Sequence, residues 1–91
     1  MEKETSLNLL IVSPEGVIYE GKAHSIILPG EKGVFEVAPY HKRLLSRLLA
    51  GKIIVDGHAL RIRRGVAKVG LENTVVLVEE DRAAQVVEAA G

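Results

Sequence analysis

Short apolar runs that alternate with a period of two, and that end at glycine or proline, restrict the fold of this chain more than any other feature. Leu7, Leu9 and Ile11 recur at every second position, as they would on one face of a strand. Residues 33–37 alternate as regularly, with Phe35 and its neighbours on opposite sides. The pattern therefore predicts strands, not amphipathic helices, over most of the chain.

Turn signals lie at nearly every junction between these runs. Asp56-Gly57 is the clearest, because a two-residue type I′ turn needs positive φ at both central residues. It predicts a hairpin over residues 52–62. The chain should then contain about eight or nine short strands, which is typical of an all-β sandwich or barrel. The expected strands are residues 6–13, 17–21, 23–30, 33–37, 52–55, 58–62, 65–70 and 73–80.

Residues 41–51 fit two interpretations. Leu44, Leu45, Leu48 and Leu49 stand at helical spacing, but they also fit a strand that buries Leu45 and Leu49 on one face. So short a segment cannot be assigned by periodicity alone, and both interpretations stay open.

The end of the chain is predicted to be a helix. Acidic residues precede it, where the positive end of a helix dipole favours negative charge. Apolar positions follow at i, i+3, i+4 and i+7. We expect a β-sandwich domain over residues 1–80 and a short helical segment over residues 81–91. The apolar positions of that segment are Ala83, Val86, Val87 and Ala90.

Composition excludes several classes of function. The chain has 91 residues, enough for one modest core, and 12 basic residues balance 12 acidic ones. A neutral chain has no overall field to attract nucleic acid or an anionic membrane. It has no cysteine for disulfides or thiol chemistry. Its charged N-terminus is unlike a signal peptide, and no apolar run approaches the roughly 20 residues of a spanning helix.

No catalytic, metal or cofactor motif stands out. Gly30 and Gly33 lack the spacing and the following lysine of a phosphate loop. The three histidines, His24, His41 and His58, stand 17 residues apart, so they contain no short-spaced ligand pair. No serine lies in a nucleophile elbow. We therefore predict neither an enzyme nor a metal or cofactor site.

Two basic clusters remain, one at Lys42, Arg43 and Arg47 and one at residues 61–64. No aromatic residue interleaves with them, so they form no base-stacking platform. On a regular strand, Arg61 and Arg63 would share a face, and Arg64 would point to the opposite one. They could be simple solvated charges or contacts for an acidic protein partner. The residues alone favour a small β scaffold that functions through its surface.

Residues 28–45, LPGEKGVFEVAPYHKRLL, resemble the most specific segment of the epsilon subunit of F-type ATP synthase, in its N-terminal β-sandwich domain. The resemblance extends over nearly the whole chain. It includes LNLLIVSPEGVIYEG near the start, AGKI at residues 50–53, GVAKV at residues 65–69 and NTVVLVEE at residues 73–80. The matching positions of the central segment are Leu28, Pro29, Gly30, Gly33, Phe35, Val37, Pro39, His41, Leu44 and Leu45.

The resemblance implies a flattened β-sandwich of about eight to ten strands at the foot of a rotary central stalk. Such a subunit binds the gamma subunit, rests on the c-ring, and couples rotation to ATP synthesis or hydrolysis without chemistry of its own. It implies a peripheral position on the cytoplasmic face of the bacterial inner membrane, reached through the complex. By position, the gamma interface would include Ser13, His41 and Ser46, and the c-ring interface Gly30, Glu31, Lys32, Gly33, Val34 and Glu36.

Three departures from the family pattern matter. The family usually carries a C-terminal helical hairpin, which needs about 35–45 residues. We expect these 91 residues neither to inhibit ATP hydrolysis nor to bind ATP by that route. Glu36 replaces a usual glycine, and relatives carry an acidic residue where Val34 stands. We hypothesise that Glu36 takes over an acidic contact with the c-ring. Tyr40 replaces a glycine, and Lys42-Arg43 replaces Ala-Pro.

Two other functions fit the sequence less well. A stand-alone ligand-binding or protein-interaction module, such as a biotinyl-type carrier, would need a modifiable lysine at a hairpin tip. The clearest hairpin has Asp56-Gly57 at its tip instead. A small hydrolase would need a catalytic constellation, which the sequence lacks.

Overall fold

The computed structural model describes residues 6–81, which form eight strands and no helix. The all-β prediction is confirmed, whereas the predicted C-terminal helix lies outside the described residues. No helix within residues 6–81 is long and apolar enough to cross a membrane. The strands are β1 (Leu7–Ser13), β2 (Gly16–Ala23), β3 (Ile26–Gly30), β4 (Gly33–Val37), β5 (Leu44–Leu48), β6 (Gly51–Val55), β7 (His58–Val69) and β8 (Asn73–Glu80).

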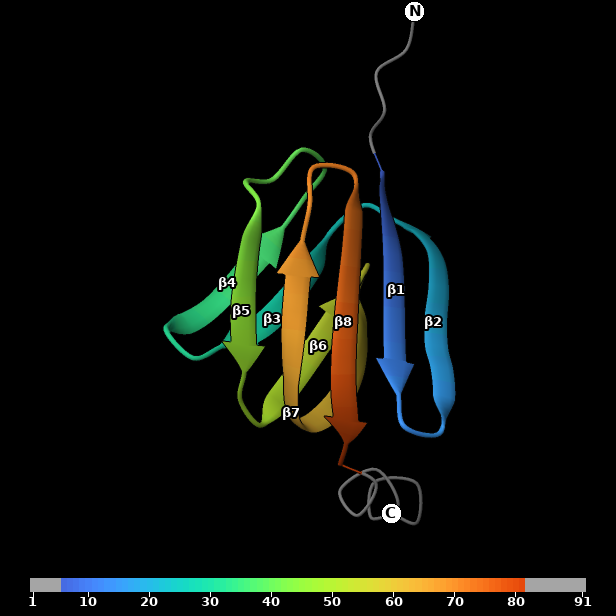
Figure 1. Cartoon of the computed structure of the whole chain (residues 1–91), viewed down its shortest axis with the longest axis vertical. Coiled ribbons are helices and arrows are strands. Elements are labelled where there is room, and N and C mark those ends of the chain that lie inside the picture. The colour runs from blue at the N-terminus through green and yellow to red at the C-terminus, as the bar shows by residue number, and fades with distance from the viewer. Residues whose placement is uncertain (1–5, 82–91) are drawn as a thin grey trace, which may run out of the picture.

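The strands are arranged in two layers that share the long strand β7 (Figure 1). The front layer has the order β2-β1-β8-β7-β5, in which β1 and β8 are parallel and the other pairs antiparallel. Behind it lie β4, β3 and β6, and β6 pairs with the first half of β7. A single pair of residues, Gly30 and Leu48, joins β3 to β5. Two layers of strands packed face to face in this way form a flattened sandwich.

The core lies between the layers and is built from aliphatic side chains. In β1 the predicted alternation is confirmed, because Leu7, Leu9 and Ile11 are 1–2% exposed. Aromatic residues contribute little: of the three in the chain, Tyr19 and Phe35 are partly buried against the core, and Tyr40 is 55% exposed. The other buried apolar residues are Ala23, Ile26, Leu28, Val37, Leu48, Ile53, Val55, Ile62, Ala67, Val69, Val76 and Val78.

One prediction about the strand boundaries needs correction. Residues 58–62 and 65–70 were expected to be separate strands but belong to one strand, β7, with a register shift between Ile62 and Arg64. Such a bulge bends a strand, so β7 passes from the rear layer to the front layer. Of the two interpretations left open for residues 41–51, the structure shows the strand, at residues 44–48.

The strand β5 also buries the opposite set of leucines from the one expected. Leu45 and Leu49 are 72% and 49% exposed, whereas Leu48 is 1% exposed. Pairing with β7 sets this phase, since Leu44 lies opposite the buried Val69. Alternation along β5 then turns Leu44 and Leu48 toward the core and Leu45 toward solvent.

Candidate functional site

The outward side of the front layer is an apolar surface, which we call the front face. Two rows of paired residues cross it. One row runs Leu10, Val75, Lys68, Leu45, and the other runs Val12, Leu77, Val66, Arg47. Leu45, Leu77 and Val66 are 72%, 54% and 40% exposed. A group of exposed apolar side chains in the middle of a sheet with a polar rim is typical of a docking surface. The front face is therefore the candidate functional site.

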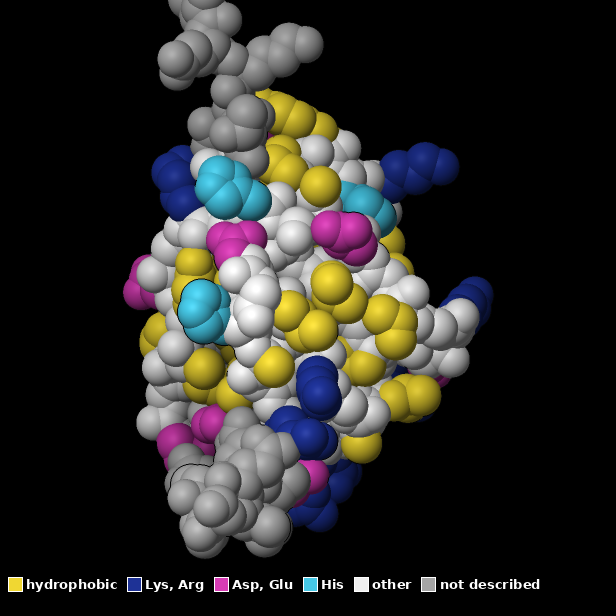
Figure 2. All heavy atoms as spheres, turned by 180° about the vertical axis from the view of Figure 1, so that it is seen from behind, with side chains coloured by type: hydrophobic (Ala, Val, Ile, Leu, Met, Phe, Trp, Pro, Cys, Tyr) yellow, Lys and Arg dark blue, Asp and Glu magenta, His cyan; other side chains and the backbone are white. Residues whose placement is uncertain are grey.

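The opposite side of the molecule differs in how far its apolar residues are exposed. Figure 2 shows apolar side chains gathered there as well. Ile27 and Ile54 pair in the centre of this rear face but are only half-exposed, and Ala59 beside them is small. The front face thus offers larger apolar side chains to a partner than the rear face does.

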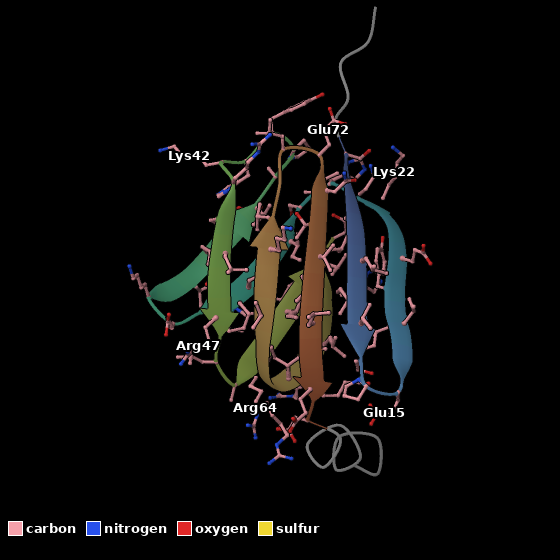
Figure 3. The ribbon with its side chains drawn as sticks, in the orientation of Figure 1. Glu15, Lys22, Lys42, Arg47, Arg64 and Glu72 are labelled. Carbon is pink, nitrogen blue, oxygen red and sulfur yellow. The ribbon has the colours of Figure 1, made fainter. Side chains whose placement is uncertain are left out.

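Charged residues surround one end of the front face. Arg63 and Arg64 both approach a carboxylate oxygen of Glu79, at 3.5 and 3.6 Å. The bulge in β7 accounts for this, and the regular alternation predicted for residues 61–64 is wrong at this point. Figure 3 shows Arg64 and Arg47 at the same end of the sheet. A hollow of about 720 Å³ lies there, lined by Val12, Ser13, Pro14, Arg47, Leu48, Leu49, Ala50, Arg63, Arg64, Gly65, Val66, Leu77, Val78 and Glu79.

Ser13, predicted to face the gamma subunit, lies at this end and has a local structural role. Its side chain is buried, and the residue is only 7% exposed. The hydroxyl accepts a hydrogen bond from the backbone N–H of Glu15 at 3.2 Å and donates toward the carbonyl of Gly16 at 3.4 Å. These bonds shape the turn between β1 and β2. Ser13 thus borders the hollow without presenting a free hydroxyl to solvent.

His41, the second predicted gamma contact, lies at the other end of the front layer. Lys42, which follows His41, and Glu15, two residues after Ser13, lie at opposite ends in Figure 3. The imidazole Nδ1 is 2.8 Å from the carbonyl of Lys42, and the backbone N–H donates to Ala38 at 3.2 Å. His41 therefore closes its own loop by hydrogen bonding, whatever it contacts outside the chain.

Ser46, the third predicted gamma contact, does not lie on the front face. It pairs with the buried Ala67, so it points to the inner side of β5. It lines a hollow of about 440 Å³ together with the hairpin of β3 and β4. Its hydroxyl donates to the carbonyl of Arg47 at 3.1 Å. The structure thus places Ser46 beside the predicted c-ring residues, away from Ser13 and His41.

The predicted c-ring residues form one continuous hairpin. Gly30 and Gly33 pair at its tip, and Glu31 donates its N–H to the carbonyl of Arg47 at 3.1 Å. The hairpin projects at the side of the molecule, where β4 is an edge strand (Figure 1). Val34 and Glu36 share the outward face of β4, as the alternation predicted, and both are exposed. Lys32 is exposed at the same tip.

The glycines of this hairpin serve its backbone. Gly33 has a φ of +124°, a conformation that other residues rarely adopt. Gly30 is tightly packed, because a Cβ there would lie 2.7 Å from the ring of Phe35. Both glycines are thus explained by the geometry of the turn.

Asp56 forms a clamp that sequence analysis did not single out. Its carboxylate accepts hydrogen bonds from the backbone N–H of His24 at 3.0 Å and of Ser25 at 3.0 Å. These bonds lower the pKa of Asp56 below its ordinary value, first through Ser25 and then through His24, with smaller help from the charges of His24 and His58. Asp56 was predicted only as a turn residue, and it also joins the β6–β7 turn to the connection between β2 and β3.

The described part of the chain offers no metal centre. Within residues 6–81 no group of three His, Asp or Glu side chains could hold a metal ion. Figure 2 shows the histidines as separate groups.

Sequence analysis did not predict the front face as a site. The outward members of the alternating runs, such as Val66 and Leu77, were a signal for it.

Comparison with known proteins relates this fold to one family. Residues 6–84 match the family model described as the beta-sandwich domain of the ATP synthase delta/epsilon chain. An ATP synthase epsilon chain of Sulfurimonas denitrificans is 40% identical over 80 residues, covering 82% of this chain and 62% of that protein. One of Campylobacter concisus is 40% identical over 78 residues, covering 80% and 60%. The chain thus spans about three fifths of the length of these relatives.

Solved structures show the same fold at much lower identity. A chain in the Euglena gracilis mitochondrial ATP synthase, a structure of OSCP, F1 and c-ring, matches with a TM-score of 0.76 at 17% identity. The match covers 99% of this chain and 66% of that one. A chain from the central stalk and c-ring of Tetrahymena thermophila mitochondrial ATP synthase has a TM-score of 0.70 at 11% identity, covering 88% and 67%. The family match, the relatives and the fold agree: the chain belongs to the ATP synthase delta/epsilon family and contains its β-sandwich domain.

Proposed function

We propose that this chain is a non-catalytic subunit of the central stalk of a rotary ATP synthase. In this role it binds the gamma subunit, rests on the c-ring and transmits rotation between them. Family membership supports the role, and two of the similar folds occur in structures that include a c-ring. The chain would then sit at the membrane surface only through the complex.

The observation that carries this proposal is the front face. It exposes three large apolar side chains, those of Leu45, Val66 and Leu77. Binding of a partner would remove these side chains from water, which favours the complex. Lys68 interrupts one apolar row, and Arg47 ends the other row at the polar rim. We assign this face to the gamma subunit, with Ser13 at one end and His41 at the other.

Calorimetry with the gamma subunit of the same organism tests the assignment. The long strand β7 supplies a matched pair of variants, because Val66 lies on the front face and the exposed Ala59 on the rear face. Val66→Lys should weaken binding at least about tenfold, because it would place an unpaired ammonium group in an apolar contact. Ala59→Lys should leave the affinity unchanged. Equal losses in the two variants would refute the front face as the interface, and no binding by the unaltered chain would refute the stalk role.

The hairpin of β3 and β4 is proposed to face the c-ring. Glu36 and Val34 project from the same side of this edge strand, so a carboxylate at position 36 lies beside an exposed apolar side chain. An acidic contact across the interface would weaken with salt. Glu36→Gln should lower c-ring binding at low salt and converge with the unaltered chain at high salt. Identical assembly at every salt concentration would reject this contact.

A further inference from the structure

Tyr40 adopts a backbone conformation that its side chain disfavours. Its φ is +65°, in the left-handed region where a Cβ approaches the following carbonyl oxygen. Asp56 has a positive φ too, but its carboxylate forms the clamp described above. Tyr40 is 55% exposed, so burial of the ring does not account for its conformation.

Hydrogen bonds hold the loop in this shape. The N–H of Tyr40 donates to the carbonyl of Leu71 at 2.9 Å, which ties the loop to the turn between β7 and β8. The bonds of His41 to Ala38 and Lys42 fix the next residue. The loop therefore determines where the Tyr40 ring projects. Strain that the surrounding structure maintains is often found at functional sites.

The surroundings of Tyr40 indicate what would bind it. Leu71, whose carbonyl accepts the hydrogen bond from the N–H of Tyr40, is 45% exposed and adds an apolar side chain at this end of the sheet. Lys42 and Arg43 follow at once in the sequence and are exposed. Figure 3 shows Lys42 at the same end of the front layer as Glu72. The result is an exposed aromatic side chain and an aliphatic one with two cations nearby.

From this arrangement we propose that Tyr40 is an anchor for the stalk partner, inserting its ring into an apolar recess with a carboxylate-rich rim. Tyrosine is among the residues most often found at the energetic centre of protein interfaces. Lys42 and Arg43 would meet the carboxylates and speed association. The proposal rests on the stalk function proposed above, and it explains why a tyrosine occupies a position whose backbone conformation suits glycine.

Substitutions at Tyr40 separate an interface role from a structural one. Glycine and asparagine both tolerate the left-handed conformation, so Tyr40→Gly and Tyr40→Asn should fold at least as well as the unaltered chain. Both should nevertheless bind the gamma subunit at least about tenfold more weakly. Tyr40→Phe keeps both the ring and the strain, and it is the matched control that should retain most of the affinity. Thermal unfolding and calorimetry measure the two quantities independently.

The outcomes distinguish the two proposals. If the unaltered chain binds gamma and Tyr40→Gly and Tyr40→Asn bind as tightly, the anchor is rejected and the stalk function stands. If the unaltered chain does not bind, the stalk function fails, and the anchor fails with it. Replacing Lys42 and Arg43 together by glutamate should slow association most at low salt. An association rate that does not change would reject the carboxylate-rich rim.

Discussion

The carboxylate of Asp56 accepts a hydrogen bond from the backbone N–H of Ser25, 31 residues earlier in the chain, at 3.0 Å. The N–H of Asp56 in turn donates to the carbonyl of Ser25 at 3.3 Å. A turn residue at one hairpin tip thereby fixes the connection between two other strands. Hydrogen bonds to an ionised carboxylate are stronger than neutral ones, so the clamp should depend on pH.

The first prediction concerns the charge of Asp56. Its pKa in the folded chain lies below the ordinary value of 3.8, chiefly because of the N–H groups of Ser25 and His24. A lowered folded-state pKa means that the stabilisation is present above 3.8 and is lost as the pH falls through the folded-state pKa. Asp56→Asn, which keeps the shape and tolerates the positive φ, should therefore unfold at a lower temperature at neutral pH.

The difference in unfolding temperature between Asp56→Asn and the unaltered chain should disappear as the pH falls. Thermal unfolding across a pH series measures it. The charges of His24 and His58 also lower the pKa of Asp56 and so favour the ionised carboxylate. A difference in unfolding temperature that stays constant down to about pH 2 would show that the charge of Asp56 does not stabilise the fold.

The second prediction concerns a hydroxyl group in the core. Thr74 is 1% exposed, and its Oγ1 has no hydrogen-bond partner within the described structure. A buried polar atom without a partner loses its hydration and gains nothing in return. Thr74→Val, which has nearly the same shape, should raise the free energy of unfolding by about 1 kcal/mol. Thr74→Ser keeps the hydroxyl, loses the methyl group and should be destabilising. A valine variant less stable than threonine would mean that the hydroxyl is satisfied in solution.

The third prediction concerns the turn between β1 and β2. The hydroxyl of Ser13 accepts a hydrogen bond from Glu15 in a site that is only 7% exposed. Ser13→Ala should lower the free energy of unfolding by about 1 kcal/mol, measured by urea denaturation. Ser46→Ala removes a hydroxyl group from a more exposed site and should change the free energy of unfolding by less than about 0.5 kcal/mol. Equal effects of the two substitutions would mean that the turn does not depend on the hydroxyl.

Much of the fold could be predicted from the sequence because period-two alternation determines which side of a strand is buried. This was enough for β1 and β4. It was not enough for residues 44–49, whose four leucines fit two strand phases, and pairing with Val69 across the sheet decided between them. The bulge near Arg64 also could not be predicted, since a long-range register shift leaves no local pattern.

The candidate site was harder to predict because it depends on distant strands. Leu77 and Val66 are neighbours on the front face only because β7 and β8 pair in that register. Ser13, His41 and Ser46 were placed together by resemblance, whereas the structure sets the first two at opposite ends and turns the third inward. Whether all three contact the gamma subunit stays a prediction.

The last prediction concerns the close approach of β7 and β8. A Cβ at Gly65 would lie 2.6 Å from the carbonyl oxygen of Leu77 and 3.2 Å from a methyl carbon of Val78. The obstructing oxygen belongs to the backbone, so it can move only if the two strands separate. Gly65→Ala should therefore lower the free energy of unfolding by about 1–3 kcal/mol, the usual effect of overpacking. Lys68→Ala, at an exposed position on the same strand, is the control and should stay within about 0.5 kcal/mol.

Urea denaturation of Gly65→Ala and Lys68→Ala measures the change in the free energy of unfolding in each variant. Binding of the gamma subunit to the front face is a second measurement. If the strands separate, Leu77 and Val66 shift relative to each other, so Gly65→Ala should also weaken gamma binding although residue 65 is only half-exposed. An alanine variant as stable as the unaltered chain would mean that the front layer relaxes without strain at this point. The register of β7 and β8 would then be less rigid than the close approach at Gly65 requires.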